Sequence, residues 1–369
     1  MDIDYLIVGS GLTGAVLARM LHDAGFAVQV LERRTHVGGN VHDHVHAESG
    51  IVVHTYGPHY FRTNDDGLWQ FVRRFTDFYR YEAELKSLVD GRHENWPIAG
   101  SYIRRTVGEG WKPEFTGQPS NFEQASLTMM PRPIYEKFVK GYTEKQWGVP
   151  ASSLSAGLAK RFDVREDDEP RLMLHRHQGL PTGGYSRMMQ NMLAGIPVQT
   201  DVDYLGNRAA FQPRRMTIFT GPIDEYYAFD LGRLAYRGQR RSHEYLPHVQ
   251  SFQPCGQVNN PSPADGPHVR TLEWKHMMPS EAVARIRGTL LTRETPFTPT
   301  SSGDYEYPFP DEANTRLYER YRERADRTEG LLVCGRLGEY RYYDMDQAIA
   351  RAQLLARRVL TGAELPQAA

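Results

Sequence analysis

A short apolar strand, three spaced glycines and a helix-forming run open the chain. Gly9, Gly11 and Gly14 follow the strand directly. In a strand-to-helix turn of this kind, the first glycine permits a tight turn, the second lets the backbone approach a pyrophosphate, and the third lets the helix pack close to the sheet. The helix N-terminus presents free N–H groups and a partial positive charge to the phosphates. The spacing therefore predicts a dinucleotide site that includes Leu12 and Thr13.

An acidic residue at the end of the next strand strengthens this prediction. Residues 27–31 form a second apolar run, and Glu32 follows it, 21 positions after Gly11. A carboxylate at this place accepts hydrogen bonds from a ribose 2′-hydroxyl. A tight structural turn is the alternative interpretation of the glycines. The register of strand, helix, second strand and acid favours the nucleotide.

The composition excludes several classes of protein. The chain has 369 residues, 40% hydrophobic and 24% charged, with a formal net charge of −1. This length predicts two or three domains, and the charge gives no general attraction to nucleic acid or to an anionic membrane. No apolar run approaches the roughly 20 residues of a membrane-spanning helix, and Cys255 and Cys334 are the only cysteines. We therefore expect a cytoplasmic protein with no disulfide framework, metal cluster, nucleic-acid partner or membrane partner.

The elements that must position these residues are those of an α/β protein. A late strand at 331–334 and a helix at 346–360 are expected to rejoin the N-terminal sheet. Aromatic residues at helical spacing over Trp69–Tyr79 predict a mostly helical segment, and alternation at 269–274 predicts antiparallel strands. The polar stretch 152–181 lacks periodicity and is expected to be a mobile loop. The predicted domains are a discontinuous dinucleotide-binding domain (1–66 with 186–235 and 311–369), a helical domain (67–185) and an antiparallel sheet domain (236–310).

Seven motifs, spread in order over nearly the whole chain, add a more specific pattern. Two of them are long: Tyr142–Gly148 reads YTEKQWG, and Gly335–Asp346 reads GRLGEYRYYDMD. With these motifs the chain resembles the bacterial UDP-galactopyranose mutases. The other five motifs are Gly9–Gly14, Val37–Asn40, Tyr56–His59, Gln178–Tyr185 and Thr220–Asp224.

The resemblance implies an FAD-dependent isomerase. Enzymes of this family interconvert the pyranose and furanose forms of a nucleotide-linked hexose, here UDP-galactopyranose and UDP-galactofuranose for cell-wall polysaccharide synthesis. The resemblance implies that FAD acts when reduced, through attack of flavin N5 on the anomeric carbon, and that NAD(P)H or another reductant reduces it. It also implies a Rossmann-like FAD-binding domain beside a helical domain and an antiparallel β-sheet domain. We expect the chain to form a homo-oligomer.

The resemblance also implies roles for individual residues. The substrate diphosphate leaves and returns, and arginine suits that task because its planar, permanently charged guanidinium binds phosphate through two donors. Arg161, in the polar stretch, resembles the family's arginine that closes on the diphosphate. Expected substrate-binding residues are Tyr142, Trp147, Arg161, Arg240, Arg270, Tyr307, Arg336 and Tyr342, and expected catalytic residues are His59, Arg62, Arg161 and Arg336. Expected cofactor-binding residues are Gly9, Gly11, Leu12, Thr13, Gly14, Glu32, Arg33, Gly39, Asn40, His59, Gly335, Arg336, Asp344 and Met345, and no metal ligand is expected.

Two residues depart from the family pattern. Arg62 stands where a second histidine commonly lies near the flavin, and a fixed cation there would favour the anionic reduced flavin or bind an acidic group on the sugar. Leu172 stands where a tyrosine contacts the nucleotide. These departures leave open a mutase acting on another UDP- or dTDP-linked sugar, including a deoxysugar. The N-terminal fold also leaves open a flavin oxidoreductase of the amine oxidase type.

Two further patterns have plainer interpretations. His42, His44 and His46 alternate along one predicted strand. Neighbours on one face of a strand lie about 6.5 Å apart, so such a row does not converge on a single ion. The basic cluster around Arg240 could be a solvated face instead of a phosphate site.

Overall fold

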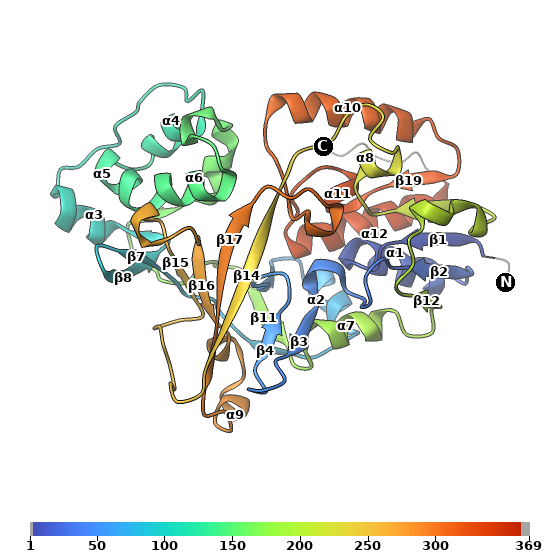
Figure 1. Cartoon of the computed structure of the whole chain (residues 1–369), viewed down its shortest axis with the longest axis horizontal. Coiled ribbons are helices and arrows are strands. Elements are labelled where there is room, and N and C mark those ends of the chain that lie inside the picture. The colour runs from blue at the N-terminus through green and yellow to red at the C-terminus, as the bar shows by residue number, and fades with distance from the viewer. Residues whose placement is uncertain (1–2, 363–369) are drawn as a thin grey trace.

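The computed structural model describes residues 3–362, which form two lobes connected by long strands (Figure 1). The first lobe is built on a parallel five-stranded sheet with the strand order β12-β2-β1-β13-β19. Tyr5 of β1 pairs with Val28 of β2 and with Met216 of β13, so the sheet joins segments far apart in the sequence. This arrangement confirms the predicted Rossmann-like α/β fold. The strands are β1 (Tyr5–Val8), β2 (Val28–Leu31), β12 (Val198–Gln199), β13 (Met216–Phe219) and β19 (Leu331–Val333).

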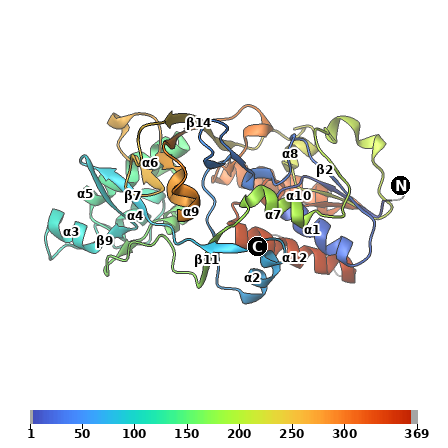
Figure 2. The same ribbon diagram turned by 90° about the horizontal axis from the view of Figure 1, so that it is seen from below.

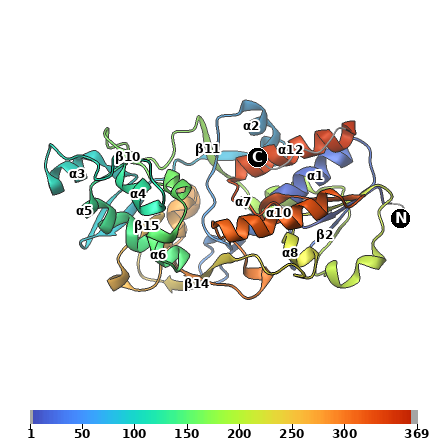
Figure 3. The ribbon, with the colours of Figure 1, turned by 90° about the horizontal axis from the view of Figure 1, so that it is seen from above.

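Helices cover both faces of this sheet because successive side chains of a strand point to opposite faces. Tyr5 and Ile7 share a core with helices α1, α7 and α12, whereas Leu6 belongs to a core on the other face. Helices α8 and α10 lie on that other face, as two views of the ribbon agree (Figure 2, Figure 3). The helices are α1 (Leu12–Asp23), α7 (Gly184–Met192), α8 (Ile223–Tyr226), α10 (Glu312–Asp326), α11 (Gly335–Gly338) and α12 (Met345–Thr361).

The second lobe carries a seven-stranded sheet with the strand order β18-β14-β17-β16-β15-β7-β8. Neighbouring strands are antiparallel, except that β15 and β7 run parallel. The long strands β14 and β17 lie between the helices of the second lobe and the first lobe (Figure 1). The strands are β7 (Leu85–Val89), β8 (Arg92–Trp96), β14 (Tyr236–Leu246), β15 (Gln257–Asn259), β16 (Arg270–Glu273), β17 (Thr289–Phe297) and β18 (Tyr307–Pro308), and the short helix α9 is Ser280–Val283.

The segment 67–185 is less helical than its aromatic spacing predicts. Helix α2 ends at Arg73, and Phe78 lies in strand β6 instead of continuing the helix. Aromatic residues pack well on a sheet, so their spacing alone did not separate the two structures. A local signal for a hairpin was present in Asp90 and Gly91, whose positive φ angles of 50° and 73° form the turn between β7 and β8. The elements are α2 (Asp66–Arg73), β6 (Phe78–Arg80) and β9 (Ile98–Ala99), and elsewhere β3 (Asp43–Val45), β4 (Val52–His54) and β5 (Phe61–Thr63).

Four short helices pack at the end of the second sheet. Phe122 of α4 and Phe138, in the π-helical turn Glu136–Lys140 between α5 and α6, share a core with Val89 and Ile98 of the strands. The polar stretch that follows contains a 3₁₀ turn at Ala156–Arg161 and two short strands. The elements are α3 (Gly100–Val107), α4 (Phe122–Leu127), α5 (Arg132–Tyr135), α6 (Gly141–Trp147), β10 (Val164–Arg165) and β11 (His177–Pro181).

The parallel sheet draws its strands from segments that all lie within the predicted dinucleotide-binding domain. The ends of that predicted domain, residues 1–2 and 363–369, lie outside the described residues. Within 3–362, no helix has both the length and the apolar content needed to cross a membrane.

Candidate active site

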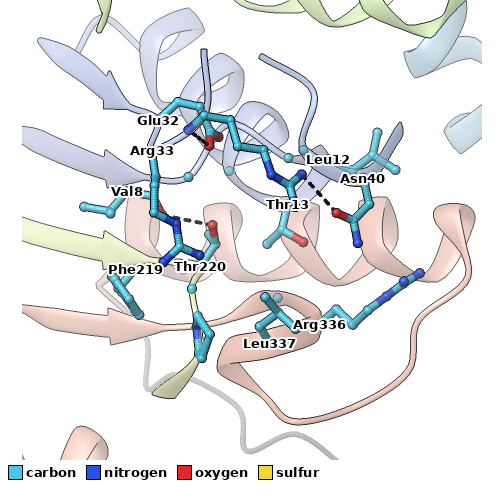
Figure 4. Close-up of a pocket in the computed structure, with 18 of the residues that line it drawn as sticks. Val8, Leu12, Thr13, Glu32, Arg33, Asn40, Phe219, Thr220, Arg336 and Leu337 are labelled. Atoms are coloured by element: carbon cyan, nitrogen blue, oxygen red, sulfur yellow. Dashed lines mark hydrogen bonds between the residues drawn. The ribbon is translucent and has the colours of Figure 1, made fainter. Parts of the chain in front are cut away.

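A first cavity lies at the carboxyl edge of the parallel sheet. In an open α/β sheet this edge is where ligands bind. Glu32 and Arg336 face this cavity from opposite sides (Figure 4). All the predicted cofactor residues but one line it: Gly9, Gly11, Leu12, Thr13, Gly14, Glu32, Arg33, Gly39, Asn40, His59, Gly335, Arg336 and Met345.

The glycines have the separate tasks that their spacing predicts. Gly9 has a φ of 105°, and a Cβ on Gly14 would lie 2.0 Å from the carbonyl oxygen of Gly9. A Cβ on Gly39 would lie 2.8 Å from the Cα of Gly11. A Cβ on Gly11 itself would meet no protein atom closer than 3.9 Å. The bare face of Gly11 therefore opens into the cavity, which fits a pyrophosphate lying against it.

Glu32 is held in place by the turn that it adjoins. Its Oε2 accepts from the backbone N–H and the hydroxyl of Ser10 at 2.8 and 2.6 Å, and its Oε1 accepts from the N–H of Arg34 at 2.9 Å. A carboxylate has about four acceptor positions, so one remains for a ribose hydroxyl. Sequence reasoning missed Arg34, whose guanidinium donates to Asn40 Oδ1 at 3.0 Å and lines the cavity.

Two histidines fix the turn that forms the inner wall of the first cavity. His59 donates from Nδ1 to the carbonyl of Gly57 at 2.7 Å, so Nδ1 carries the proton and Nε2 keeps its lone pair. The N–H of His59 donates to Nδ1 of buried His54 at 3.1 Å. Desolvation lowers the pKa of His54 to about 4. Desolvation, with His54 and Arg336 adding to it, lowers the pKa of His59 well below 6.5, so both rings are neutral at pH 7.

A second cavity is lined by residues of the second lobe and of the motif at Gly335–Asp346. The structure brings six predicted substrate residues to it: Tyr142, Trp147, Arg161, Arg270, Tyr307 and Tyr342. Eight lining residues were not predicted, although two of them, Thr143 and Gln146, lie inside the Tyr142–Gly148 motif. The other six lie outside the motifs: Trp96, Phe122, Leu158, Phe162, Gln257 and Asn259.

Tyr342 connects the two cavities. The guanidinium carbons of Arg161 and Arg336 lie 4.0 and 4.7 Å from its ring centroid, and the ring of Tyr307 is nearly parallel to it at 5.9 Å. Arg336 lines the first cavity, whereas Arg161 lines the second. Among the described residues, the buried hydroxyl of Thr143 has no hydrogen-bond partner, and Thr143 lines the second cavity. These groups suit a polar, anionic ligand that extends from one cavity toward the other.

A row of paired charges crosses the seven-stranded sheet beneath the junction of the two cavities at Tyr342. Arg241, Glu294 and Arg270 are direct neighbours on β14, β17 and β16. Fully buried Glu294 accepts from Arg241 at 2.9 Å and from Arg270, and Glu306 accepts two bonds from Arg241 at 2.8 Å. Burial opposes ionisation of Glu294, but Arg270 and Arg241 outweigh it and lower the pKa of its carboxyl. Gly57 packs on this row, where a Cβ would lie 2.8 Å from Glu294 Oε1.

Lys145 of α6 holds the hairpin that connects β15 to β16. Asn259 and Arg270, at the base of that hairpin, pair directly across the two strands and line the second cavity. Nζ of Lys145 lies close to four backbone carbonyl oxygens of the hairpin, and burial lowers the pKa of this amine to about 8. The oxygens belong to Asn260, Ser262, Gly266 and His268, at 2.8, 2.8, 3.0 and 3.0 Å.

Three residues lie elsewhere than the sequence predicts. Arg240 is exposed and stacks on Phe297 at 4.6 Å, because alternation along β14 turns it away from Arg241 and both cavities. Arg62 donates to Asp344 at 2.9 Å, and neither residue lines the first or the second cavity. Arg240 therefore lies on the exposed face of β14, whereas Arg62 and Asp344 pair with each other outside both cavities.

The two remaining sequence features also lie outside the cavities. The N–H of Leu172 donates to the carbonyl of Ala83, which ties the polar stretch to the second lobe. His42 and His44 both bond the hydroxyl of Thr55, at 2.8 and 2.9 Å. Across residues 3–362, no group of three or more His, Cys, Asp or Glu side chains is placed to hold a metal ion.

Comparison with known proteins places this geometry in a family. The family model described as UDP-galactopyranose mutase matches residues 137–342, and the NAD(P)-binding Rossmann-like domain matches residues 7–75. The chain is 30% identical to the probable UDP-galactopyranose mutase of Klebsiella pneumoniae, over 97% of this chain and 95% of the relative. It is 28% identical to the dTDP-fucopyranose mutase of Escherichia coli, over 94% and 96%.

Solved structures share the fold. A crystal structure of reduced UDP-galactopyranose mutase matches with a TM-score of 0.74 at 16% identity, over 99% of this chain and 97% of that one. A putrescine oxidase from a study of cofactor-binding redesign matches with a TM-score of 0.57 at 15% identity, over 98% and 99%. The overall fold is therefore common to a mutase and an oxidase, and only the site separates them.

Proposed function

Because the chain belongs to the UDP-galactopyranose mutase family and is an isomerase, we propose that it interconverts UDP-galactopyranose and UDP-galactofuranose with FAD as its cofactor. The observation that carries the proposal is the pair of arginines at Tyr342. Arg336 belongs to the dinucleotide cavity and Arg161 to the second cavity, yet both contact one ring. A nucleotide sugar bound there would place its diphosphate between the cavities.

The first cavity has the groups that FAD requires. The bare face of Gly11 would lie against the pyrophosphate, and the free acceptor position of Glu32 would take a hydroxyl of the adenosine ribose. His59 and Met345 would lie toward the flavin ring. Flavin, when bound and reduced, supplies the electron pair that allows the anomeric C1–O bond to be broken and remade without net oxidation.

The protein's own task is to hold the diphosphate while its bond to the sugar is broken. Arg161, Arg270 and Arg336 keep their charge at any working pH and offer planar pairs of donors. Tyr142, Tyr307 and Tyr342 add hydroxyl donors around them. Burial raises the pKa of Tyr307 to about 12, so its phenol remains protonated and can donate. Arg161 is exposed at the end of a 3₁₀ turn, which suits a residue that closes on bound substrate.

His59 contributes an acceptor and not a charge. Its Nδ1–H is committed to Gly57, and its lowered pKa keeps the ring neutral. The free Nε2 would accept a hydrogen bond from a group on the cofactor or the sugar. Trp147, 8% exposed on α6, would close the pocket around the sugar.

A dTDP-linked deoxyhexose is the second candidate substrate. The dTDP-fucopyranose mutase of Escherichia coli is 28% identical to this chain, close to the 30% of the Klebsiella pneumoniae relative. The two candidates share the cofactor, the diphosphate and the reaction. They differ in the base, in the 2′-hydroxyl of the nucleotide pentose and in one hydroxyl of the hexose.

The test is product analysis with reduced and oxidised protein. Dithionite-reduced protein is incubated anaerobically with UDP- and dTDP-linked hexopyranoses, and the nucleotide sugars are separated by chromatography. We expect a furanose isomer only from reduced protein, with no consumption of O₂ or nicotinamide per turnover. Stoichiometric O₂ consumption with an oxidised product would instead identify an oxidoreductase. Heat release of the cofactor should yield FAD, and FMN would contradict the assignment of Glu32.

Two further properties belong to the same proposal. NAD(P)H or another reductant would convert the flavin to its active form, which anaerobic bleaching of the flavin absorbance by each candidate would reveal. The chain would act as a homo-oligomer, which light scattering of the holoprotein would measure.

A further inference from the structure

Three polar side chains form a relay that ends at the second cavity. The hydroxyl of Tyr60 donates to Oε1 of Gln257 at 3.3 Å, and Nε2 of Gln257 donates to Oδ1 of Asn259 at 2.9 Å. Gln257 and Asn259 are 4% and 5% exposed, and both line the cavity. Such a chain of bonds is costly to bury unless every member is satisfied.

The relay uses one end of the Asn259 amide. In the structure the oxygen of Gln257 accepts from the Tyr60 hydroxyl, and the amino group of Gln257 faces Asn259. The oxygen of Asn259 is then taken by Gln257, which leaves the amino group of Asn259 as the free end. Among residues 3–362, that amino group has no hydrogen-bond acceptor. A ligand in the cavity therefore meets a preoriented pair of N–H donors.

The position of the relay associates it with the sugar of the substrate. Tyr60 directly follows His59, which lines the dinucleotide cavity. Asn259 is the direct cross-strand neighbour of Arg270, next to the junction at Tyr342. The sugar must reach the cofactor through that junction, because its anomeric carbon is the reacting atom. The apolar side chains Trp96 and Phe162 line the same cavity and suit the flat base.

We propose that the amide of Asn259, oriented by Gln257 and Tyr60, donates a hydrogen bond to one hydroxyl of the hexose and selects against the sugar that lacks it. The inference rests on the proposed function and specifies the substrate as a hexose with a hydroxyl at this position. A deoxysugar would leave the donor buried and unpaired. Sites built to bond a hydroxyl reject the analogue without it far more strongly than apolar sites reject an added group.

The test compares substrates that differ by one hydroxyl in wild type and in Asn259→Leu. UDP-galactopyranose and its 2-, 3- and 6-deoxy analogues are assayed with dithionite-reduced holoenzyme, and kcat/KM is compared within each protein. In wild type, we expect one deoxy analogue to be disfavoured by about 10- to 100-fold, the range for an unpaired buried donor. In Asn259→Leu that ratio should fall toward 1. Equal ratios in the two proteins for every analogue would overturn the proposal.

Two variants test whether the Asn259 amide acts as a hydrogen-bond donor and whether Tyr60, through Gln257, orients it. Asn259→Asp keeps the size and the bond from Gln257 but presents an acceptor, so it should lose the same discrimination as Asn259→Leu. Retention of full discrimination by Asn259→Asp would contradict a donor role. Tyr60→Phe removes the bond that orients Gln257 and should reduce the discrimination by about 3- to 10-fold. Ser87→Ala is the matched control, because Ser87 is the β7 neighbour of Asn259 but does not line the cavity.

Binding measurements separate this role from a merely structural one. We expect Asn259→Leu to weaken the binding of UDP-galactopyranose, while the Kd of UDP, which has no hexose, stays unchanged. Equal weakening of both ligands would place the contact on the nucleotide and overturn the proposal. A wild-type protein that neither isomerises UDP-galactopyranose nor binds it more tightly than UDP would instead reject the proposed function.

Discussion

The backbone N–H of His59 donates to Nδ1 of His54 at 3.1 Å, so the turn beside the dinucleotide cavity is held by a histidine that must stay unprotonated at that nitrogen. His54 is 5% exposed and packs against the rings of Tyr185 and Trp274. Neither the bond nor the burial can be inferred from the Tyr56–His59 motif. The relationship makes this buried ring one of the groups on which the acid stability of the protein depends.

We expect the free energy of unfolding to decrease as the pH is lowered, because His54 is buried in its neutral form. Desolvation lowers its pKa from 6.5 to about 4 in the folded protein. Between these values the unfolded chain binds more protons, so the contribution is complete above pH 6.5 and is lost as the pH falls toward 4. The difference corresponds to roughly 3 kcal/mol. Urea unfolding at several pH values should show a shallower pH dependence in His54→Asn, which keeps an acceptor near Nδ1, than in wild type. His93→Asn, at an exposed site of β8, should keep the wild-type dependence.

Gly11→Val should remove the flavin while leaving the chain folded. Gly11 has φ −66° and ψ 179°, which valine can adopt, and a Cβ there would clear protein atoms by 3.9 Å. The added side chain would occupy the space of the pyrophosphate. The ratio of flavin to protein absorbance should drop to background with a near-normal circular dichroism spectrum. Gly110→Val, where a Cβ meets nothing within 4 Å, should remain yellow. A yellow Gly11→Val protein would refute the assigned cofactor position.

Arg161→Ala and Arg336→Ala should each reduce kcat/KM by about 10- to 150-fold, since a charge-assisted hydrogen bond contributes about 1.5–3 kcal/mol. Arg161→Ala should raise KM more, because this exposed arginine is expected to close on bound substrate. Arg240→Ala provides the control, because Arg240 points away from both cavities and stacks on Phe297. Steady-state kinetics that show the largest loss for Arg240→Ala would contradict the site.

Glu294→Gln should destabilise the protein strongly. Glu294 is 0% exposed and pairs with Arg241 and Arg270, so its neutralisation takes the carboxylate partner from Arg270, whereas Arg241 keeps Glu306. Such a loss costs about 3–5 kcal/mol. Urea unfolding should show it, together with a raised KM from displaced Arg270. Glu244→Gln, on the neighbouring strand β14 and in an exposed pair with Arg293, should change stability by less than about 1 kcal/mol.

Arg62→Gln should leave sugar preference nearly unchanged. The guanidinium of Arg62 is held by Asp344 at 2.9 Å and lines neither cavity. The departure from the family histidine then carries no information about the substrate. Relative kcat/KM over a panel of nucleotide sugars, with the flavin reduction potential, would check this. If the relative kcat/KM values or the reduction potential changed as much in Arg62→Gln as in Arg336→Ala, the conclusion would be that Arg62 belongs to the site.

The dinucleotide cavity could be predicted from sequence because its parts are local. Gly9, Gly11 and Gly14 act through backbone conformation and close approach, which depend on residue type and spacing alone. Glu32 follows from the end of the next strand. The motif resemblance added Arg161, Arg270, Arg336 and Tyr342, which recur in fixed contexts.

The tertiary structure decided which charged and polar residues share the site. Arg240 and Arg241 are adjacent, and only the register of β14 turns one outward and the other onto Glu294. Charged residues on both faces give no apolar contrast from which that register could be inferred. Tyr60 and Asn259 meet only because Gln257, 197 residues from Tyr60, lies between them in the folded chain. Local spacing determines what the backbone can do, whereas long-range packing determines where each side chain points and which partner remains free for a ligand.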